Sequence, residues 1–231
     1  MKQLRLICFT AFLALLCSCH QITDPFASDG RGSNTIGFYY NGVKYVQYSE
    51  ARYMSSPAKY VYAWREDNDI LILSYVWKAA YPWDGAIEAL GFRIPGQRQY
   101  YEGDVILLFG SQLMVVCKRT QDDNDSSLYE DEDEYNYLFS HLSPSSKRQY
   151  LFPVDARITV KRRENSVLFC DFEITGVMEG QEGGETVQLT KGVFDVTING
   201  FKNHDIPLAC EDYHKLHERY CDYIGQYYDK P

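Results

Sequence analysis

The chain of 231 residues carries 23 Lys and Arg against 32 Asp and Glu, which gives a formal net charge of −9. An acidic chain without basic clusters argues against nucleic-acid binding and against adsorption to anionic lipid. The 20 Tyr, 12 Phe and 3 Trp favour β-strands, because aromatic rings fit a pleated surface.

The N-terminus predicts a bacterial lipoprotein signal peptide over residues 1–18. Lys2 and Arg5 precede the apolar stretch Leu6 to Leu16, and small residues precede Cys19. As a helix this stretch spans about 16 Å, roughly half of a bilayer's hydrocarbon core, so it does not make a permanent anchor. Cleavage before Cys19 leaves that cysteine to be acylated, and its lipid is expected to hold the protein on the membrane. The alternative is an ordinary secretory signal.

The first elements after the signal are a tether and a hairpin. Residues 19–35 are polar and rich in Gly, so we expect a flexible tether behind the lipidated cysteine. Ile36 to Tyr40 and Val43 to Val46 flank Asn41-Gly42, the signature of a type I′ hairpin. This turn predicts two facing pairs on one face: Tyr40 with Val43, and Phe38 with Tyr45.

Short strands continue along the chain without intervening long helices. We expect them at residues 59–65, 70–77, 87–94, 105–109 and 113–118, the first two joined in a hairpin across Glu66 to Asp69.

The clearest alternation of apolar and polar residues lies in 156–161 and 168–174. Both apolar sets meet one core if the connection is a three-residue loop, Glu164-Asn165-Ser166. That loop predicts two facing pairs: Val160 with Cys170, and Ile158 with Phe172. In the next strand, 187–198, an alternating set is expected to point inward and the intervening residues outward: Phe194, Val196 and Ile198 inward, Asp195 and Thr197 outward.

The C-terminal segment has helical periodicity from Pro207 to about Tyr228. Its apolar stripe recurs at three- and four-residue spacing: Ala209, Tyr213, Leu216, Tyr220, Tyr223 and Tyr227. The predicted fold is therefore all-β, an antiparallel β-sandwich or open barrel over residues 36–200, with a C-terminal amphipathic helix within 201–231. We expect this helix to dock on the sandwich or across its open end.

A second stripe of the same helix contains potential metal ligands: Cys210, His214, His217 and Cys221. Its ends lie about 16 Å apart along the axis, so one ion cannot take all four and we expect no metal. The alternative is a partial site, made by His214 with Cys210 or His217 and completed from elsewhere in the chain.

Four cysteines besides Cys19 follow the signal: Cys117, Cys170, Cys210 and Cys221. In an exported protein they allow three full disulfide pairings, and the spacing within one helix excludes Cys210 with Cys221. Cys170 is expected to face the core, where a free thiol packs well. The pairing stays open.

Catalytic and calcium-binding motifs are weak. The acidic run 122–134 places Asp123, Asp125, Ser127, Asp131 and Glu134 at calcium-loop positions, but Leu128 stands where the sharp turn needs Gly. We therefore expect a solvated acidic loop. The chain lacks nucleophile-elbow, zinc-protease and phosphate-loop motifs, and Asp171 and Glu173 are expected on an outer strand face, so no catalytic residue and no cofactor is predicted.

The segment most suggestive of binding surrounds a Pro/Gly turn. Trp77, Tyr81 and Trp83 offer flat rings to sugar C–H faces, and Asp84 accepts hydrogen bonds from hydroxyl groups. These four are the predicted ligand-binding residues. The alternative is that the rings fold back over an open sandwich end.

Two stretches, Asn34 to Tyr45 and Leu189 to Ile198, resemble the opening hairpin and closing strand of uncharacterised β-sandwich lipoproteins of Gram-negative gut anaerobes. The resemblance covers about a quarter of the chain and carries no catalytic residues. It departs at Tyr45, where Trp is expected, and in the helical tail. It implies an outer-membrane lipoprotein, and with Asp24 as the single acid near Cys19, surface and periplasmic placement both stay open.

These observations predict a lipid-anchored module of the cell envelope, with a binding or structural role and no catalysis. Its expected partners are the membrane, through the lipid on Cys19, and a glycan or an envelope protein. Three alternatives are a carbohydrate-binding accessory protein using the loop aromatics, an adhesin or pilus-type component with an open sheet edge, and a hydrolase.

Overall fold

The computed structural model describes residues 25–47, 51–53, 56–58, 61–75, 87–118, 148–178, 186–199 and 206–228. Their elements in chain order are η1 (Pro25–Ala27), β1 (Thr35–Tyr40), β2 (Val43–Gln47), β3 (Ala51–Tyr53), β4 (Ser56–Ala58), β5 (Val61–Glu66), β6 (Asp69–Tyr75), β7 (Ile87–Pro95), β8 (Val105–Leu107), η2 (Gly110–Gln112), β9 (Leu113–Lys118), β10 (Arg148–Glu164), β11 (Val167–Met178), β12 (Thr186–Thr197) and α3 (Ile206–Tyr228).

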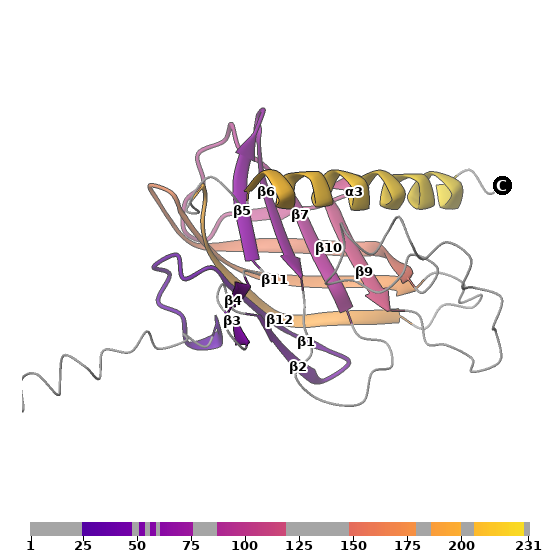
Figure 1. Ribbon diagram of the computed structural model, residues 1–231, viewed down its shortest axis with the longest axis horizontal. Helices are drawn as coiled ribbons and strands as arrows, with labels where there is room; N and C mark the ends of the chain where they lie inside the picture. Colours follow the sequence, from indigo (N-terminus) through magenta and orange to yellow (C-terminus); the bar gives the residue numbers. More distant parts are fainter. Residues whose placement is uncertain are drawn as a thin grey trace, which may run out of the picture.

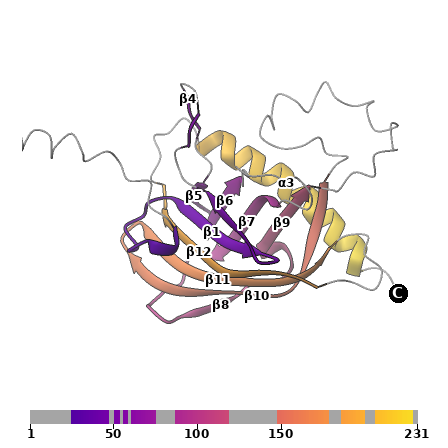
Figure 2. The same cartoon turned by 90° about the horizontal axis from the view of Figure 1, so that it is seen from below.

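One antiparallel sheet of ten strands runs in the order β2-β1-β12-β11-β10-β9-β7-β6-β5, with β8 paired to β10, while β3 and β4 pair separately. The sheet curls until Asn199, just after β12, donates its backbone N–H to Ala63 O in β5 at 2.8 Å. The Asn199 Oδ1 accepts a hydrogen bond from the Arg65 N–H at 3.0 Å. The result is a nearly closed barrel (Figure 2), which confirms the open-barrel form of the predicted fold class.

Aromatic side chains fill the barrel interior. Phe92 lies 5.3 Å from Phe172 and 5.5 Å from Phe194, measured between ring centroids. Phe38 continues the cluster and stacks on Tyr45 at 5.2 Å. Each buried ring contributes about 1.5–3 kcal/mol through removal of apolar surface from water. The interior is thus a packed core.

Helix α3 lies across the outer face of β5, β6, β7 and β9 (Figure 1). Strand β6 is consequently buried on both faces: Ile70 and Ile72 join the interior, while Leu71 and Leu73 pack toward the helix. Four residues of the predicted helical stripe are buried there: Ala209, Tyr213, Leu216 and Tyr220. This confirms the predicted helix and its docking on the sheet.

Both hairpins with a predicted register pair as expected. Tyr40 faces Val43 and Phe38 faces Tyr45 around Asn41-Gly42, whose φ values of 46° and 78° are those of a type I′ turn. In the later hairpin Val160 faces Cys170, and Ile158 faces Phe172.

The turn of the later hairpin differs from the prediction. Glu164 pairs with Val167, so the loop contains two residues, Asn165 and Ser166, and not three. The register shifts between Val160 and Arg162, and this β-bulge supplies the extra residue that the apolar alternation requires. The loop between β5 and β6 is also shorter than the predicted Glu66 to Asp69, because these two residues pair with each other.

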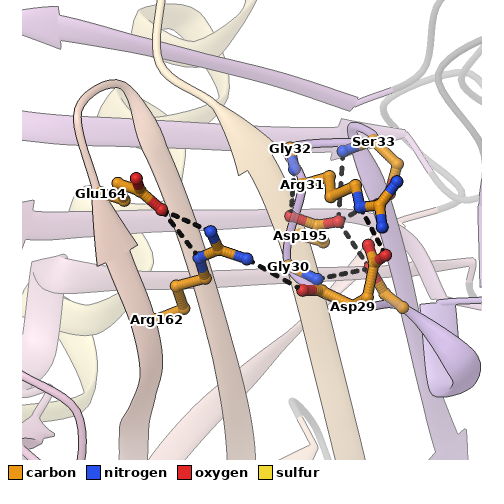
Figure 3. Close-up of polar contacts among 9 residues, drawn as sticks. Asp29, Gly30, Arg31, Gly32, Ser33, Arg162, Glu164 and Asp195 are labelled. Atoms are coloured by element: carbon orange, nitrogen blue, oxygen red, sulfur yellow. Dashed lines mark hydrogen bonds and ion pairs between the residues drawn. The ribbon is translucent and has the colours of Figure 1, made fainter.

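Residues 25–34 form an N-terminal segment that packs on the barrel, which corrects the predicted flexible tether for this part of residues 19–35. Pro25 and Gly30 are buried, and the Asp195 carboxylate of β12 binds the segment (Figure 3). Asp195 accepts hydrogen bonds from Ser28 Oγ (2.5 Å), Gly32 N (2.7 Å), and Ser33 N (3.2 Å) and Oγ (2.7 Å). Asp195 does lie on the outer strand face as predicted, but the segment covers it completely, so it is buried and not solvated.

Candidate functional site

The sequence-predicted site residues lie outside the described residues. These are the lipidation residue Cys19, the ligand-binding candidates Trp77, Tyr81, Trp83 and Asp84, and the acidic run 122–134. Lipidation and sugar binding by these residues therefore stay predictions.

The candidate carboxylates Asp171 and Glu173 face outward on β11, as predicted. Asp171 forms an ion pair with Lys161 at 3.2 Å, and Glu173 forms one with Arg157. All four side chains are roughly half exposed. They form a solvated face of the barrel with opposite charges paired, which is not the cleft that glycoside cleavage requires.

A pocket of about 350 Å³ opens at one end of the barrel, next to the turns that follow β5 and β10. We call it the arginine pocket, since three arginines contribute to its lining: Arg65, Gly96, Gln97, Arg98, Gln99, Tyr100, Arg163 and Asn165. Arg65 comes from the end of β5, Arg163 from the end of β10, and the other side from the loop after β7. The strand order brings these three distant segments together, and no carboxylate contributes to the lining.

Arg65 and Arg163 have no carboxylate partner among the described residues. Arg65 Nη1 donates to Gly96 O at 3.3 Å, and Arg163 Nη1 donates to the backbone carbonyls of Asn165 and Val167. Burial lowers the pKa of Arg163, and the positive charge of Arg65 lowers it further. Two positive charges thus line one pocket, and these hydrogen bonds use only the Nη1 atom of each guanidinium group.

The other side of the arginine pocket is ordered by Tyr100. Its hydroxyl donates to Pro95 O at 2.5 Å, and the Arg98 guanidinium lies 5.7 Å from the centre of its ring. Arg98 also lies 3.5 Å from Asp104, a carboxylate outside the lining, which partly balances its charge. The pocket therefore combines the guanidinium groups of Arg65 and Arg163, that of Arg98 with its charge partly neutralised by Asp104, and three residues with side-chain amides: Gln97, Gln99 and Asn165.

A second cluster joins β5 to the start of α3. Glu66 Oε1 lies 2.8 Å from His214 Nε2, and Glu66 Oε2 accepts a hydrogen bond from Cys210 Sγ at 3.1 Å. Trp64 Nε1 donates to the same Oε2 at 3.2 Å. The three side chains Glu66, Cys210 and His214 are of types that hold a metal ion, and their ligand atoms all lie within 4.8 Å of one another. This is the pair His214 and Cys210 completed from elsewhere, which the sequence offered as the alternative to no site.

The hydrogen bonds of this cluster shift the pKa values of its members. Burial raises the pKa of the Cys210 thiol to about 11, and its hydrogen bond to Glu66 adds to the effect. Burial also acts to raise the pKa of Glu66, but the hydrogen bonds from Cys210, Trp64 and His214 outweigh it, and the pKa lies below its ordinary value. Within this cluster Cys210 is therefore a protonated thiol and Glu66 an ionised carboxylate.

The other half of the helical stripe does not join the cluster. His217 Nε2 lies 2.7 Å from Ser111 O in η2, and its ring stacks on Tyr213. Cys221 Sγ lies 3.7 Å from His217 Nδ1. The four cysteines whose pairing was open, Cys117, Cys170, Cys210 and Cys221, form no disulfide within the described residues.

The sequence did not single out the arginine pocket or Glu66. One signal was available, because Arg65 and Arg163 each stand directly before a predicted hairpin turn in an acidic chain. That the two turns meet at one end of the barrel follows only from the strand order.

Comparison of the chain with known protein families, curated proteins and solved structures finds no match. Within the described residues, none of the helices has the length and apolar character needed to cross a membrane.

Proposed function

We propose that this protein is a lipid-anchored binding module of the bacterial cell envelope, non-catalytic, that holds an acidic carbohydrate in the arginine pocket. The observation that carries the proposal is the pair Arg65 and Arg163, two guanidinium groups that have no carboxylate partner among the described residues, in a chain of net charge −9. A guanidinium group binds a carboxylate through two parallel hydrogen bonds, which fixes the orientation of an anionic ligand.

The rest of the lining supports a sugar as the carrier of the charge. The side-chain amides of Gln97, Gln99 and Asn165 both donate and accept hydrogen bonds, as sugar hydroxyl groups require. A volume of about 350 Å³ is at the low end for ligand pockets, which suits one charged sugar ring. The predicted aromatic platform around Trp83 would add stacking surface to the same function.

The N-terminal segment supports a position close to the membrane. Arg162 Nη1 donates to Asp29 O, so the segment lies beside the β10 to β11 turn whose Asn165 lines the pocket (Figure 3). From Cys19 to Pro25 the chain extends at most about 20 Å. A lipid on Cys19 would therefore hold this end of the barrel near the membrane surface.

Isothermal titration with oligogalacturonate, and with a neutral galacto-oligosaccharide of the same length, tests the proposal. The wild type is expected to bind the acidic oligomer only, more weakly as salt rises. Arg65→Gln should lower the affinity about tenfold or more, since a hydrogen bond to a charged group contributes about 1.5–3 kcal/mol. Arg163→Lys keeps the charge but loses the two-nitrogen geometry and should also weaken binding. Arg157→Gln, on the outer face, is the matched control.

Equal binding of the neutral oligomer, no binding of either, or an equal loss in the Arg157→Gln control would each overturn the acidic-sugar proposal.

A second candidate function, assembly by strand addition, is favoured by β8. Among the described strands it pairs with β10 alone, and Val105 and Leu107 in the strand and Phe109 just after it are 52%, 53% and 68% exposed. An open edge beside apolar side chains accepts a further strand. If the chain assembles with itself in this way, sedimentation should show concentration-dependent oligomers that Leu107→Lys disperses; a monomer at all concentrations would exclude it.

A further inference from the structure

The cluster of Glu66, Cys210 and His214 has a property that the proposed function does not use. Its three side chains come from two elements, the end of β5 and the first turns of α3, and present oxygen, sulfur and nitrogen to one point. We propose that this cluster is a zinc site that fastens the start of α3 to the barrel.

The ligand set fits Zn²⁺ better than the other common divalent cations. Thiolate, imidazole and carboxylate are its usual ligands, whereas Ca²⁺ and Mg²⁺ require oxygen alone. Cys210 and His214 stand four residues apart, which places two ligands on one helix face. Side-chain exposures of 50% for His214 and 32% for Glu66 leave a solvent-facing side for a water molecule as the fourth ligand.

The distances within the cluster suit a tetrahedral ion. Zinc bonds of about 2.0–2.3 Å place neighbouring ligand atoms about 3.3–3.8 Å apart. The contact of His214 with Glu66 Oε1, at 2.8 Å, and that of Cys210 with Glu66 Oε2, at 3.1 Å, are slightly shorter, and the ligand atoms of the three residues all lie within 4.8 Å of one another. A shift of less than about 1 Å in each side chain, well within rotamer freedom, opens the required space.

Zinc binding replaces these hydrogen bonds by three coordinate bonds. The Cys210 thiol loses its proton to solvent as the Zn–S bond forms, and His214 binds as neutral imidazole through Nε2. Glu66 is ionised already, and the Trp64 N–H, 3.2 Å from Oε2, orients its carboxylate. One proton is released for each ion bound, and no electron is transferred.

The same helix provides a matched control about two turns later. His217 and Cys221 repeat the residue types at the same spacing in reverse order, but Ser111 O faces the His217 ring and, in the part of the chain that the structure describes, no carboxylate completes a metal-binding group with them. Variants of this second pair remove an imidazole or a thiol without touching the proposed site.

The experiment uses the purified protein, reduced and freed of metal by chelator. Zn²⁺ is expected to raise the melting temperature and Co²⁺ to give a thiolate-to-cobalt charge-transfer band at one equivalent. Cys210→Ser should abolish the band, and Glu66→Gln and His214→Gln should each weaken binding at least tenfold. Cys221→Ser and His217→Gln should bind like the wild type. Circular dichroism of each variant without metal verifies that it is folded.

Three results would overturn the proposal: no Zn²⁺-dependent melting shift, no thiolate band in the wild type, or loss of the band in Cys221→Ser with retention in Cys210→Ser. Because the arginine pocket contributes none of these ligands, each result leaves the proposed sugar binding unaffected.

Discussion

Asp195→Ala is predicted to release the N-terminal segment from the barrel. The carboxylate is fully buried and accepts four hydrogen bonds of 2.5–3.2 Å from Ser28, Gly32 and Ser33. A hydrogen bond to a charged group contributes about 1.5–3 kcal/mol. The contributions of the four hydrogen bonds are not additive, because the donors of a released segment form hydrogen bonds with water instead. We expect a loss of about 3 kcal/mol, and thus about 6–12 °C in melting temperature for a chain of this size.

Two further variants separate the carboxylate from the packing around it. Asp195→Asn replaces one acceptor oxygen by an amide NH₂ that faces donors, so it should lose part of the same stability. Gly32→Ala should also displace the segment, because its φ is +79° and a Cβ there would lie 2.1 Å from Thr197 Oγ1. Asp171→Ala, an exposed acid paired with Lys161, is the control and should cost less than about 1 kcal/mol.

Thermal melts and trypsin digestion provide the readouts. Arg31 lies inside the segment, and cleavage there needs an extended, accessible backbone, so Asp195→Ala should be cut after Arg31 much faster than the wild type. If Asp195→Ala instead melts and digests like Asp171→Ala, the segment is not held by this carboxylate and the reasoning is wrong.

Four more predictions concern other parts of the chain. The mature protein should begin at an acylated Cys19 and partition with membranes, and Cys19→Ser should release a folded domain; mass spectrometry showing an unmodified N-terminus elsewhere contradicts this. Gly42→Val should lower the melting temperature by several degrees, because φ is +78° and a β-branched residue is strained in that conformation, even though a Cβ there meets nothing within 4 Å. An unchanged melting temperature would argue that the turn does not impose this strain. Trp83→Ala should leave the melting temperature unchanged and remove glycan binding, whereas a loss of about 3–5 kcal/mol without glycan binding by the wild type would retire the platform. Burial lowers the pKa of His217 in spite of its contact with Ser111 O, so the unfolded chain binds the proton more readily and stability should fall as the pH drops through about 6.5; His217→Gln should flatten that slope, and parallel slopes would refute the linkage.

Local chemistry explains which parts of the fold could be predicted. Asn41-Gly42 specifies its own turn, so the opening hairpin and its register follow from eleven consecutive residues, 36–46. The register of β10 and β11 was also predictable, because only one pairing lets both apolar sets face the same core. The sequence could not show whether the extra residue lies in the loop or in a β-bulge, since a three-residue loop and a two-residue loop with a bulge give the same alternation.

The N-terminal segment shows where composition misleads. Its glycines suggest flexibility, but Gly30 and Gly32 adopt φ values of +72° and +79° close to Phe169 and Thr197, where a side chain would clash. Alternation assigned Asp195 correctly to the outer face, yet cannot show that another part of the chain covers that face. The arginine pocket could not be predicted for a related reason, because its three arginines lie on segments that only the strand order brings together.

Where the proposed ligand and partner can bind depends on which parts of the barrel the chain itself covers. Phenylalanine rings fill the interior, so this barrel does not enclose a ligand in its centre. On the outside, α3 covers β5, β6, β7 and β9, and the N-terminal segment covers part of β1 and β12, with the Phe26 ring 5.4 Å from Tyr39. On the described part of the barrel, the rim with its arginines and the apolar edge of β8 stay accessible, as does the outer face of β10 and β11, where Lys161 and Arg157 are paired with Asp171 and Glu173. We therefore expect an anionic ligand to bind at the rim, where Arg65 and Arg163 have no carboxylate partner among the described residues, and an apolar partner to bind at β8. Arg65→Gln and Leu107→Lys should then each impair one interaction and spare the other.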